Sequence, residues 1–350
     1  MSNHDSSNHA GIGDLSGVGQ FIGDGAASMT ESNGHGASAK AMAETGRLWA
    51  TAAGVQCASI EPLAGDVSAR SYFRLSDGAG ILAHYPPELR RAYDCFRRTT
   101  ELLLRAGVPV PAIRVADPQR RWMITEDLGD HALYDEQDPG RIESAYDQAE
   151  ESVRRIRTLP AAAVADLSPA LETELLSREI RKTVSVHFSE ALQAAEVHRL
   201  EAVAYELCER LGAGPLEPAH RDFMARNLML PEKDGRIVVL DHQDLRLAPR
   251  GYDLASLCFD SSPLEHDVAD RWLQDRVAEH DLEGVWRCAA QRALKIVGTF
   301  VGFARAGRPR YLPMVPRALS TAATMLSRLP EGDGEVVALL QRCAKEAPRD

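Results

Sequence analysis

The sequence predicts an α+β fold in two lobes, a small antiparallel β-sheet with one helix followed by a mostly helical lobe. From Ile60 onward, the first part of the chain alternates short β-type segments with turn signals. One of these turns, Asp77-Gly78, is a strong hairpin signal. After His131 the apolar spacing becomes helical. The polar step at 126–130 between the two patterns is expected to be a hinge.

The chain of 350 residues is long enough for two lobes with cores of their own. Residues 1–40 are rich in Gly, Ser, Asn, Asp and His, so they bury too little apolar surface to order, and we expect a disordered tail. We place the β-lobe at residues 41–130 and the helical lobe at residues 131–350.

Composition excludes several classes of protein. The net charge of −11 argues against a general nucleic-acid binder, which would carry a basic face. The six cysteines lack metal-site spacing and are typical of a reducing compartment. There is no apolar run of membrane-spanning length and no secretory signal. We therefore expect a cytoplasmic protein with no nucleic-acid, membrane or obligate protein partner.

The expected elements of the β-lobe begin with a helix and a β-meander. In order, they are a helix at 40–53, a strand–turn–strand unit over 60–75, a strand at 81–84, a helix at 88–105, and strands at 112–116 and 122–125. The expected helices of the second lobe lie at 142–159, 172–188, 191–211, from 252 onward, 268–279, 284–306, 314–328 and 335–345. Asp253 is expected to be the N-cap of the helix that starts near 252.

The most informative stretch runs from His220 to Asp241. It contains His220-Arg221-Asp222, then Asn227, then a short strand at 237–240 that ends on Asp241. An acid, an amide five residues later and a second acid after a strand are the working residues of phosphoryl transfer. In that arrangement the first acid accepts the proton of the attacking hydroxyl, and the amide and second acid hold Mg²⁺. The alternative is that they are ordinary turn residues, but the spacing and the strand favour the catalytic interpretation.

Two other segments are candidates for nucleotide binding. The turn from Gly65 to Arg70 offers backbone N–H groups, a hydroxyl and a guanidinium to phosphates. Taken alone it would be a plain hairpin turn, but the stretch 220–241 favours the phosphate role. The backbone of the hinge could bind an adenine edge, although its acids could equally belong to a solvated turn. The residues expected to contact ATP are Gly65, Asp66, Ser68, Arg70, Glu126, Asp127 and Leu128.

Together, the stretch 220–241 and the hinge 126–130 resemble the aminoglycoside phosphotransferase/choline kinase superfamily, which has a protein-kinase-like fold. The stretches 63–75, 240–257 and 291–300 resemble more closely the anomeric kinases of bacterial cell-wall amino sugars. The resemblance covers about residues 48–330. It implies ATP- and Mg²⁺-dependent phosphorylation of C1 of N-acetylmuramate and/or N-acetylglucosamine, in peptidoglycan recycling.

The resemblance also implies roles for single residues. Asp222 would be the catalytic base, Asn227 and Asp241 the Mg²⁺ ligands, and the backbone of 126–128 the adenine site. A hemiacetal hydroxyl is more acidic than an ordinary alcohol, so a carboxylate suffices as its proton acceptor.

The third strand departs from the wider superfamily, in which it carries a Lys that grips the phosphates. Residues 81–85 contain no Lys, which gives more weight to Arg70 or Arg74 as the phosphate cation. His84 could contribute only when protonated.

The acceptor sugar is expected on the side of the helical lobe. Gln243 and Asp244 follow the metal acid directly and are expected to bond sugar hydroxyls, and Arg226 is expected to meet the transferred phosphate. On a later helix Arg292, Lys295 and Thr299 share one stripe, which would read a carboxylate or acetamide if it faced the site. The alternative is a solvated basic face.

Two other functions remain open from sequence. One is a kinase of the same fold acting on choline, an aminoglycoside or another sugar. We find no aromatic cage for a quaternary amine, and aromatic residues make up only 6% of the chain. The other is a nucleotide-binding pseudokinase, which the missing Lys favours and the complete set of acids and amide disfavours.

Overall fold

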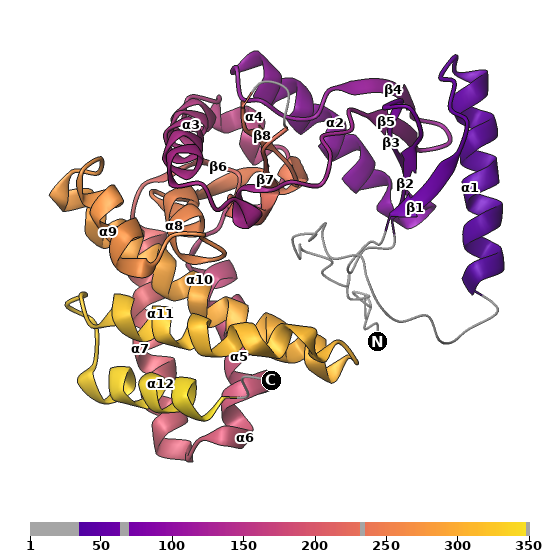
Figure 1. The fold of residues 1–350 in the computed structure, drawn as a ribbon. Coiled ribbons are helices and arrows are strands. Elements are labelled where there is room, and N and C mark those ends of the chain that lie inside the picture. Colours follow the sequence, from indigo (N-terminus) through magenta and orange to yellow (C-terminus); the bar gives the residue numbers. More distant parts are fainter. Residues whose placement is uncertain (1–34, 64–69, 232–234, 348–350) are drawn as a thin grey trace, which may run out of the picture.

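The computed structural model describes residues 35–63, 70–231 and 235–347, which form the two lobes shown in Figure 1. Residues 1–34 of the expected tail lie outside the described part of the chain. Its expected end at residue 40 is wrong, because helix α1 (His35–Ala52) begins inside it. Alanine favours helix most strongly, and four alanines stand between Ala37 and Ala43.

The β-lobe holds one antiparallel sheet of five strands in the order β1-β2-β3-β5-β4. Its strands are β1 (Ile60–Leu63), β2 (Ser71–Leu75), β3 (Gly80–His84), β4 (Ile113–Asp117) and β5 (Trp122–Thr125). These confirm the expected strands. Asp77 and Gly78 both have positive φ (60° and 67°), the geometry for which an Asp-Gly turn is suited.

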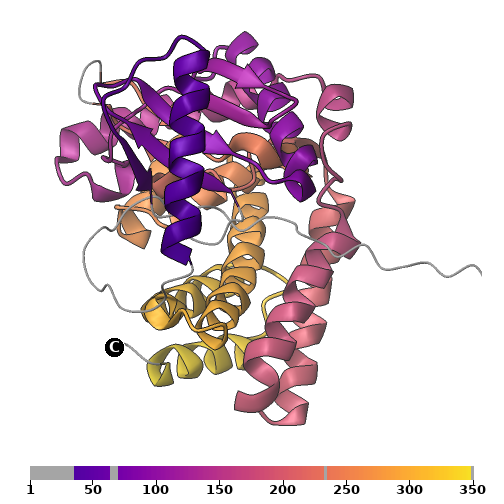
Figure 2. The same cartoon turned by 90° about the vertical axis from the view of Figure 1, so that its right-hand side faces the viewer.

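One helix packs on each face of this sheet, because successive strand residues point to opposite sides. Leu82 belongs to the core under α1, and its neighbour Ala83 belongs to the core under α2 (Arg90–Arg105). The approach of α1 is so close that a Cβ on Gly46 would stand 2.6 Å from Leu82. α1 therefore lies along the outer side of the lobe, as Figure 2 shows.

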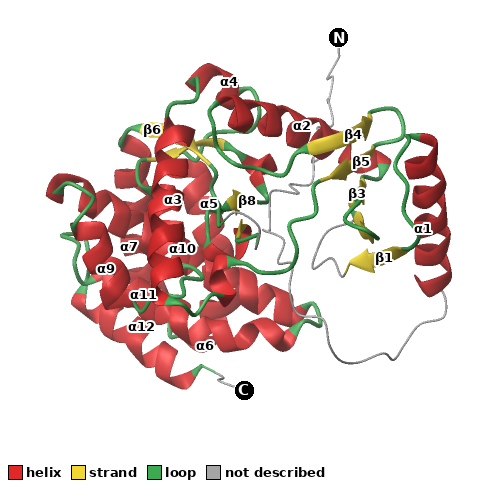
Figure 3. Cartoon of the chain, turned by 45° about the horizontal axis from the view of Figure 1, so that its top comes forward, coloured by secondary structure: helices red, strands yellow, loops and turns green. Residues whose placement is uncertain are grey.

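The second lobe is built almost entirely of helices, coloured red in Figure 3. They are α3 (Pro139–Arg157), α4 (Ala161–Ala165), α5 (Thr173–Thr183), α6 (Ser189–Ala191), α7 (Ala194–Ala213), α8 (Tyr252–Phe259), α9 (His266–Gln274), α10 (Glu279–Arg305), α11 (Val315–Leu326) and α12 (Gly334–Glu346). α10 packs against α5, α7, α8 and α11, so it forms the centre of the lobe. A π-helical turn, Val184–Phe188, continues α5.

Two short hairpins carry the segments that the sequence singled out. β6 (Leu216–Ala219) pairs with β9 (Arg246–Pro249), a pairing that the sequence did not predict. β7 (Leu228–Met229) pairs with β8 (Val238–Val239), which lies within the expected strand at 237–240. The loop 220–227 runs between β6 and β7, and Asp241 comes just after β8.

One expected helix cap is wrong. α8 has Gly251 at its N-cap, in the left-handed region with φ 89°, and Asp253 lies in its first turn. The carboxylate of Asp253 turns instead toward the loop at 220, as described below. In the part of the chain that the structure describes, no helix is both long and apolar enough to traverse a bilayer.

Candidate active site

Backbone and side-chain hydrogen bonds bring Asp222, Asn227 and Asp241 together. Nδ2 of Asn227 donates to the carbonyl of Asp222 at 2.8 Å. The N–H of Leu240 donates to the carbonyl of Asn227, and Nε2 of His220 donates to the carbonyl of Leu240, both at 2.8 Å. The end of β8 is thus joined to both ends of the loop 220–227.

The backbone of this loop has a conformation that its neighbour Asp253 secures. Arg221 has φ 81°, which is unusual for a long side chain and costs free energy. Asp253 accepts hydrogen bonds from the N–H groups of His220 at 2.7 Å and of Arg221 at 2.9 Å. These two charge-assisted bonds offset the backbone strain. They also hold the backbone just before Asp222, which sets the direction of the Asp222 side chain.

Cations surround the carboxylate of Asp222, whose side chain is 10% exposed. Nη2 of Arg292 lies 3.2 Å from Oδ1, and Nζ of Lys295 lies 4.0 Å from the same oxygen. Burial alone would raise the pKa of Asp222, but Lys295, Arg221 and Arg292 hold the pKa far below its ordinary value. Asp222 is therefore an anion at neutral pH.

The stripe on α10 faces the protein interior, so the alternative of a solvated basic face is wrong. The Arg292 side chain is 1% exposed, and its guanidinium bonds Asp260 at 2.5 Å and the carbonyl of Arg221. It also lies over the ring of Tyr252, 4.6 Å from the centroid. Lys295 is more open, with 14% of its side chain exposed.

A second set of ion pairs surrounds Arg221. Its guanidinium pairs with Glu179 of α5 at 2.7 Å and with Asp244. Asp244 also pairs with Arg246, so both of its oxygens contact arginines. The structure therefore places Asp244 in an internal ion pair, although the sequence suggested a sugar contact.

Asp241 stands at the other end of the site, in the left-handed region at φ 58°, ψ 37°. Nε2 of Gln243 donates to Oδ1 of Asp241 at 2.5 Å, so Gln243 is directed at the acid that precedes it. Burial raises the pKa of Asp241, and the nearby positive charge of Arg70 opposes this shift. A buried carboxylate of this kind is stabilised further by any cation that binds beside it.

Arg70 and Arg74 lie in different parts of the site, one near Asp241 and the other at the hinge. The Arg70 guanidinium lies 5.8 Å from the ring centroid of Tyr72 and 5.5 Å from that of Tyr85, on the side of Asp241. Arg74 pairs with the hinge acids Asp127 at 3.0 Å and Asp130 at 2.7 Å. Arg74 is thus directed at the hinge. Gly65, Asp66 and Ser68 lie outside the described residues.

His84 does not supply the missing cation. Its ring packs on Trp122, with the centroids 4.4 Å apart. Burial, with Arg121 nearby, lowers the pKa of His84, so the ring is neutral at pH 7.

The hinge meets the β7–β8 hairpin through a small apolar cluster. Leu128 and Leu240, both partly buried, pack against Ala132, Met229 and Val238. This places an apolar surface next to the backbone of 126–128, where a flat base would find both contacts and hydrogen-bonding groups.

Two further residues of the predicted site have clear positions. Within the loop 220–227, the Arg226 guanidinium lies over the ring of Tyr134, 3.6 Å from its centroid. The carboxylate of Glu126 accepts from the N–H of Ala112 at 3.4 Å, and its own N–H bonds the Ala112 carbonyl at 2.9 Å.

The donor set fits Mg²⁺ that is shared with a nucleotide. No group of three or more His, Cys, Asp or Glu side chains suited to a metal occurs among the described residues. Mg²⁺ prefers oxygen and is often held by one or two protein groups plus substrate phosphates. The amide nitrogen of Asn227 is engaged with Asp222, which leaves its oxygen for a cation beside Asp241.

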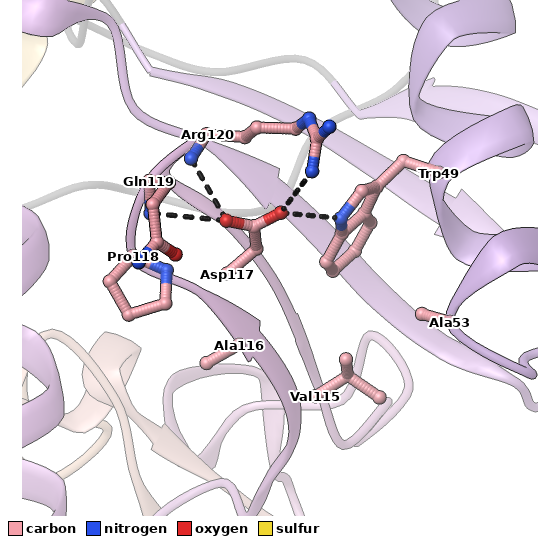
Figure 4. A pocket seen from close by; sticks show the side chains of 8 residues that line it. All are labelled: Trp49, Ala53, Val115, Ala116, Asp117, Pro118, Gln119 and Arg120. Atoms are coloured by element: carbon pink, nitrogen blue, oxygen red, sulfur yellow. Dashed lines mark hydrogen bonds and ion pairs between the residues drawn. The ribbon is translucent and has the colours of Figure 1, made fainter.

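A hollow on the outer surface of the β-lobe is separate from this site (Figure 4). It lies between α1 and the β4–β5 turn. Asp117 at its centre accepts from Nε1 of Trp49 at 3.1 Å and from the N–H groups of Gln119 and Arg120. Its carboxylate is therefore bonded within the lobe.

Sequence reasoning missed four residues that hold the site in place, Glu179, His242, Asp253 and Asp260. Each acts through a partner distant in sequence, so spacing alone gave no signal for most of them. One hint was present in the sequence, since Thr100 places a hydroxyl on the apolar side of the helix at 88–105. In the structure this hydroxyl contacts the buried ring of His242.

Comparison with known proteins shows the family of this chain. The phosphotransferase enzyme family matches residues 59–291. The N-acetylmuramate/N-acetylglucosamine kinase of Pseudomonas aeruginosa is 30% identical over 318 residues, covering 82% of this chain and 90% of that protein. The kinase of the same name from Neisseria meningitidis is 28% identical over 279 residues, covering 73% and 82%.

Solved structures show the same fold at much lower identity. The GDP complex of aminoglycoside 2′-phosphotransferase-IIIa has a TM-score of 0.61 at 12% identity, over 82% of this chain and 98% of that one. A choline/ethanolamine kinase family protein from Mesorhizobium loti has a TM-score of 0.58 at 15% identity, over 87% and 99%. The expected two-lobe α+β fold is thereby confirmed. The chain belongs to the phosphotransferase enzyme family.

Proposed function

We propose that this enzyme transfers the γ-phosphoryl group of ATP to the anomeric C1 hydroxyl of N-acetylmuramate, N-acetylglucosamine or both, with Mg²⁺. The observation that carries the proposal is the pair of hydrogen bonds that join Asn227 to Asp222 and to Leu240, the residue before Asp241. The relatives from P. aeruginosa and N. meningitidis are named for these two sugars. Both sugars are cell-wall components, so we place the reaction in peptidoglycan recycling in the cytoplasm.

On the acceptor side, Asp222 accepts a hydrogen bond from the C1 hydroxyl. This bond directs the hydroxyl oxygen of the sugar at the γ-phosphorus. A carboxylate whose pKa is held this low is a weak base, so orientation is its main contribution. As the O–P bond forms and ADP leaves, the hydroxyl becomes more acidic and its proton passes to Asp222. The relatively acidic hemiacetal hydroxyl suits such a base.

On the nucleotide side, the backbone of 126–128 holds the adenine edge while Leu128 and Leu240 contact its face. Mg²⁺, when bound, neutralises charge on the β- and γ-phosphates. The oxygen of Asn227 and the carboxylate of Asp241 would hold it. Arg70 takes the place of the absent third-strand Lys, because it lies beside Asp241.

The contacts to the sugar differ from those expected from sequence. Lys295 remains a sugar contact, since it is the more exposed cation next to Asp222. We assign Arg292 to the positioning of Asp222, because its guanidinium is buried against Asp260. Gln243 and Asp244 orient Asp241 and Arg221 in the same way. Arg226, which belongs to the loop 220–227, meets the transferred phosphoryl group.

The proposal is tested by ADP release with Mg²⁺·ATP and each sugar, in the wild type, Asp222→Asn and Asp117→Asn. We expect release that depends on either sugar, and a loss of about 10²- to 10⁴-fold in kcat for Asp222→Asn. Asp117→Asn is the matched control, because Asp117 lies on the outer surface of the β-lobe. It should retain the wild-type rate.

Two outcomes would contradict parts of the proposal separately. Turnover with choline or an aminoglycoside but with neither sugar would overturn the substrate and keep the kinase chemistry. Nucleotide binding without turnover of any acceptor would indicate a pseudokinase.

A further inference from the structure

A buried histidine joins the β-lobe to the segment that carries Asp241. His242 follows Asp241 directly, and its ring is fully buried. Nδ1 lies 2.8 Å from the hydroxyl of Thr99, and Nε2 lies 3.3 Å from that of Thr100. The ring of Phe96 packs against it with the centroids 4.5 Å apart. All three partners lie on α2, so one helix of the β-lobe supplies these three contacts.

The two hydroxyls fit a neutral imidazole. A neutral ring carries one N–H donor and one nitrogen acceptor, and a threonine hydroxyl can serve either. Each hydroxyl also lies within hydrogen-bond distance of a carbonyl of α2: Thr99 is 3.0 Å from Cys95 and from Phe96, and Thr100 is 2.8 Å from Phe96. With its single proton donated to Phe96, Thr100 can accept from Nε2–H of the ring while Thr99 donates to Nδ1. His242 and both threonines are buried, so breaking either bond leaves a ring nitrogen of His242 with neither a protein partner nor water. The contact thus fixes the ring orientation strongly.

The same short turn also fixes Asp241. Asp241 adopts left-handed φ and ψ, and the residues 242–244 form one turn of 3₁₀-helix directly after it. Nε2 of Gln243 donates to the Asp241 carboxylate at 2.5 Å. The Asp241 side chain lies near Arg70, while the ring of the following residue, His242, is held by α2. A movement of His242 relative to α2 would therefore turn the Asp241 carboxylate.

We propose that His242, clasped by Thr99 and Thr100 of α2, is a positioning residue that holds the Asp241 carboxylate in its metal-binding direction. The inference rests on the proposed role of Asp241 as a Mg²⁺ ligand. It makes the placement of α2 on the helical lobe a condition for metal binding. Groups behind a metal ligand commonly contribute tenfold or more to metal affinity.

The test is metal binding by the Thr99→Val/Thr100→Val double variant, in which valine keeps the shape and removes both hydroxyls. Mn²⁺ is titrated by electron paramagnetic resonance in the presence of ADP, without any sugar. We expect the Kd for Mn²⁺ to rise roughly tenfold. Kinase activity should require a similarly higher Mg²⁺ concentration, with little change in the KM for the sugar. Thr99→Ser/Thr100→Ser, which keeps both hydroxyls, should bind Mn²⁺ like the wild type.

The chain offers a matched control for general destabilisation. Thr321 is also buried, and its hydroxyl lies 3.1 Å from Nε2 of His266, in the helical lobe. Thr321→Val removes a similar Thr–His contact and should leave Mn²⁺ binding unchanged. The proposal is overturned if the double variant binds Mn²⁺ with wild-type affinity, or if Thr321→Val weakens binding equally. The single variant Thr99→Val gives the same reading if the double variant fails to fold.

Because no sugar is present, this experiment is independent of the substrate. A protein that bound Mn²⁺·ADP but phosphorylated neither amino sugar would contradict the proposed substrate and still decide the role of His242.

Discussion

At the scale of single residues, the site keeps one carboxylate ionised against the cost of burying it. Asp222 is nearly enclosed, yet Arg292 and Lys295 lie within 4.0 Å of its Oδ1. The positive charges outweigh burial and lower the pKa of Asp222. Asp222 therefore remains ready to receive a hydroxyl proton well below neutral pH.

Removal of the Lys295 charge should narrow the pH range over which Asp222 is ionised. In Lys295→Met the pKa of Asp222 rises, because one opposing charge is lost. The acid limb of kcat should therefore move to higher pH. The sign follows from the requirement for an anion, since activity is lost as pH falls through the pKa of Asp222. The measurement is a pH profile of kcat at saturating ATP and sugar.

Lys182→Met is the control, because Lys182 is an exposed residue of α5. It should leave the acid limb unchanged. An unshifted limb in Lys295→Met would show that Lys295 does not control the ionisation of Asp222.

At the scale of elements, the position of α10 determines where these cations stand. α10 approaches α5 closely at Gly298, where a Cβ would lie 2.3 Å from Oγ1 and 2.5 Å from Cα of Thr183. Lys295 is one helical turn earlier on α10, and its carbonyl lies 3.5 Å from the same hydroxyl. The contact between the two helices thus sets the distance from Lys295 to Asp222.

Gly298→Ala should therefore be harmful although alanine favours helix. The added methyl forces α10 and α5 apart, which should cost about 1–3 kcal/mol of the free energy of unfolding. We expect a lower Tm in calorimetry and a reduced kcat, because Lys295 and Arg292 move away from Asp222.

Gly302→Ala on the same helix is the matched control. A Cβ there has no neighbour within 4 Å. Helix propensity alone should then raise stability by up to about 1 kcal/mol. Equal effects of the two substitutions would contradict the role given to the Gly298 contact.

At the scale of the whole molecule, the sequence predicted the lobes and most elements because their signals are local. Alternation and the Asp77-Gly78 turn predicted the β-meander, and helical spacing predicted the second lobe. What failed depended on distant partners. The periodicity of α10 put Arg292 and Lys295 on one stripe without showing that it meets Asp222. Asp253 is a residue type that often caps helices, so the sequence predicted an N-cap. Its bonds to the backbone of 220–221 depend on the tertiary fold.

The link between the lobes shows the same limit. α2 contacts the helical lobe through the turn at 242–244 and through Arg91, which donates to the carbonyl of Leu167 at 3.2 Å. Neither contact has a local sequence signal. The different positions of Arg70 and Arg74 also have no local signal. Arg70 directly precedes β2 and Arg74 lies on it, and only the ion pairs of Arg74 with the hinge acids distinguish the two.

The central claim is that the phosphoryl group goes to the anomeric oxygen of an amino sugar. It is tested most directly by proton–phosphorus correlation NMR of the product formed from N-acetylglucosamine and from N-acetylmuramate. We expect a phosphorus signal coupled to the proton on C1, and no product from the methyl glycoside of N-acetylglucosamine, whose C1 oxygen is blocked. Coupling to the protons on C6, or phosphorylation of the methyl glycoside, would contradict it.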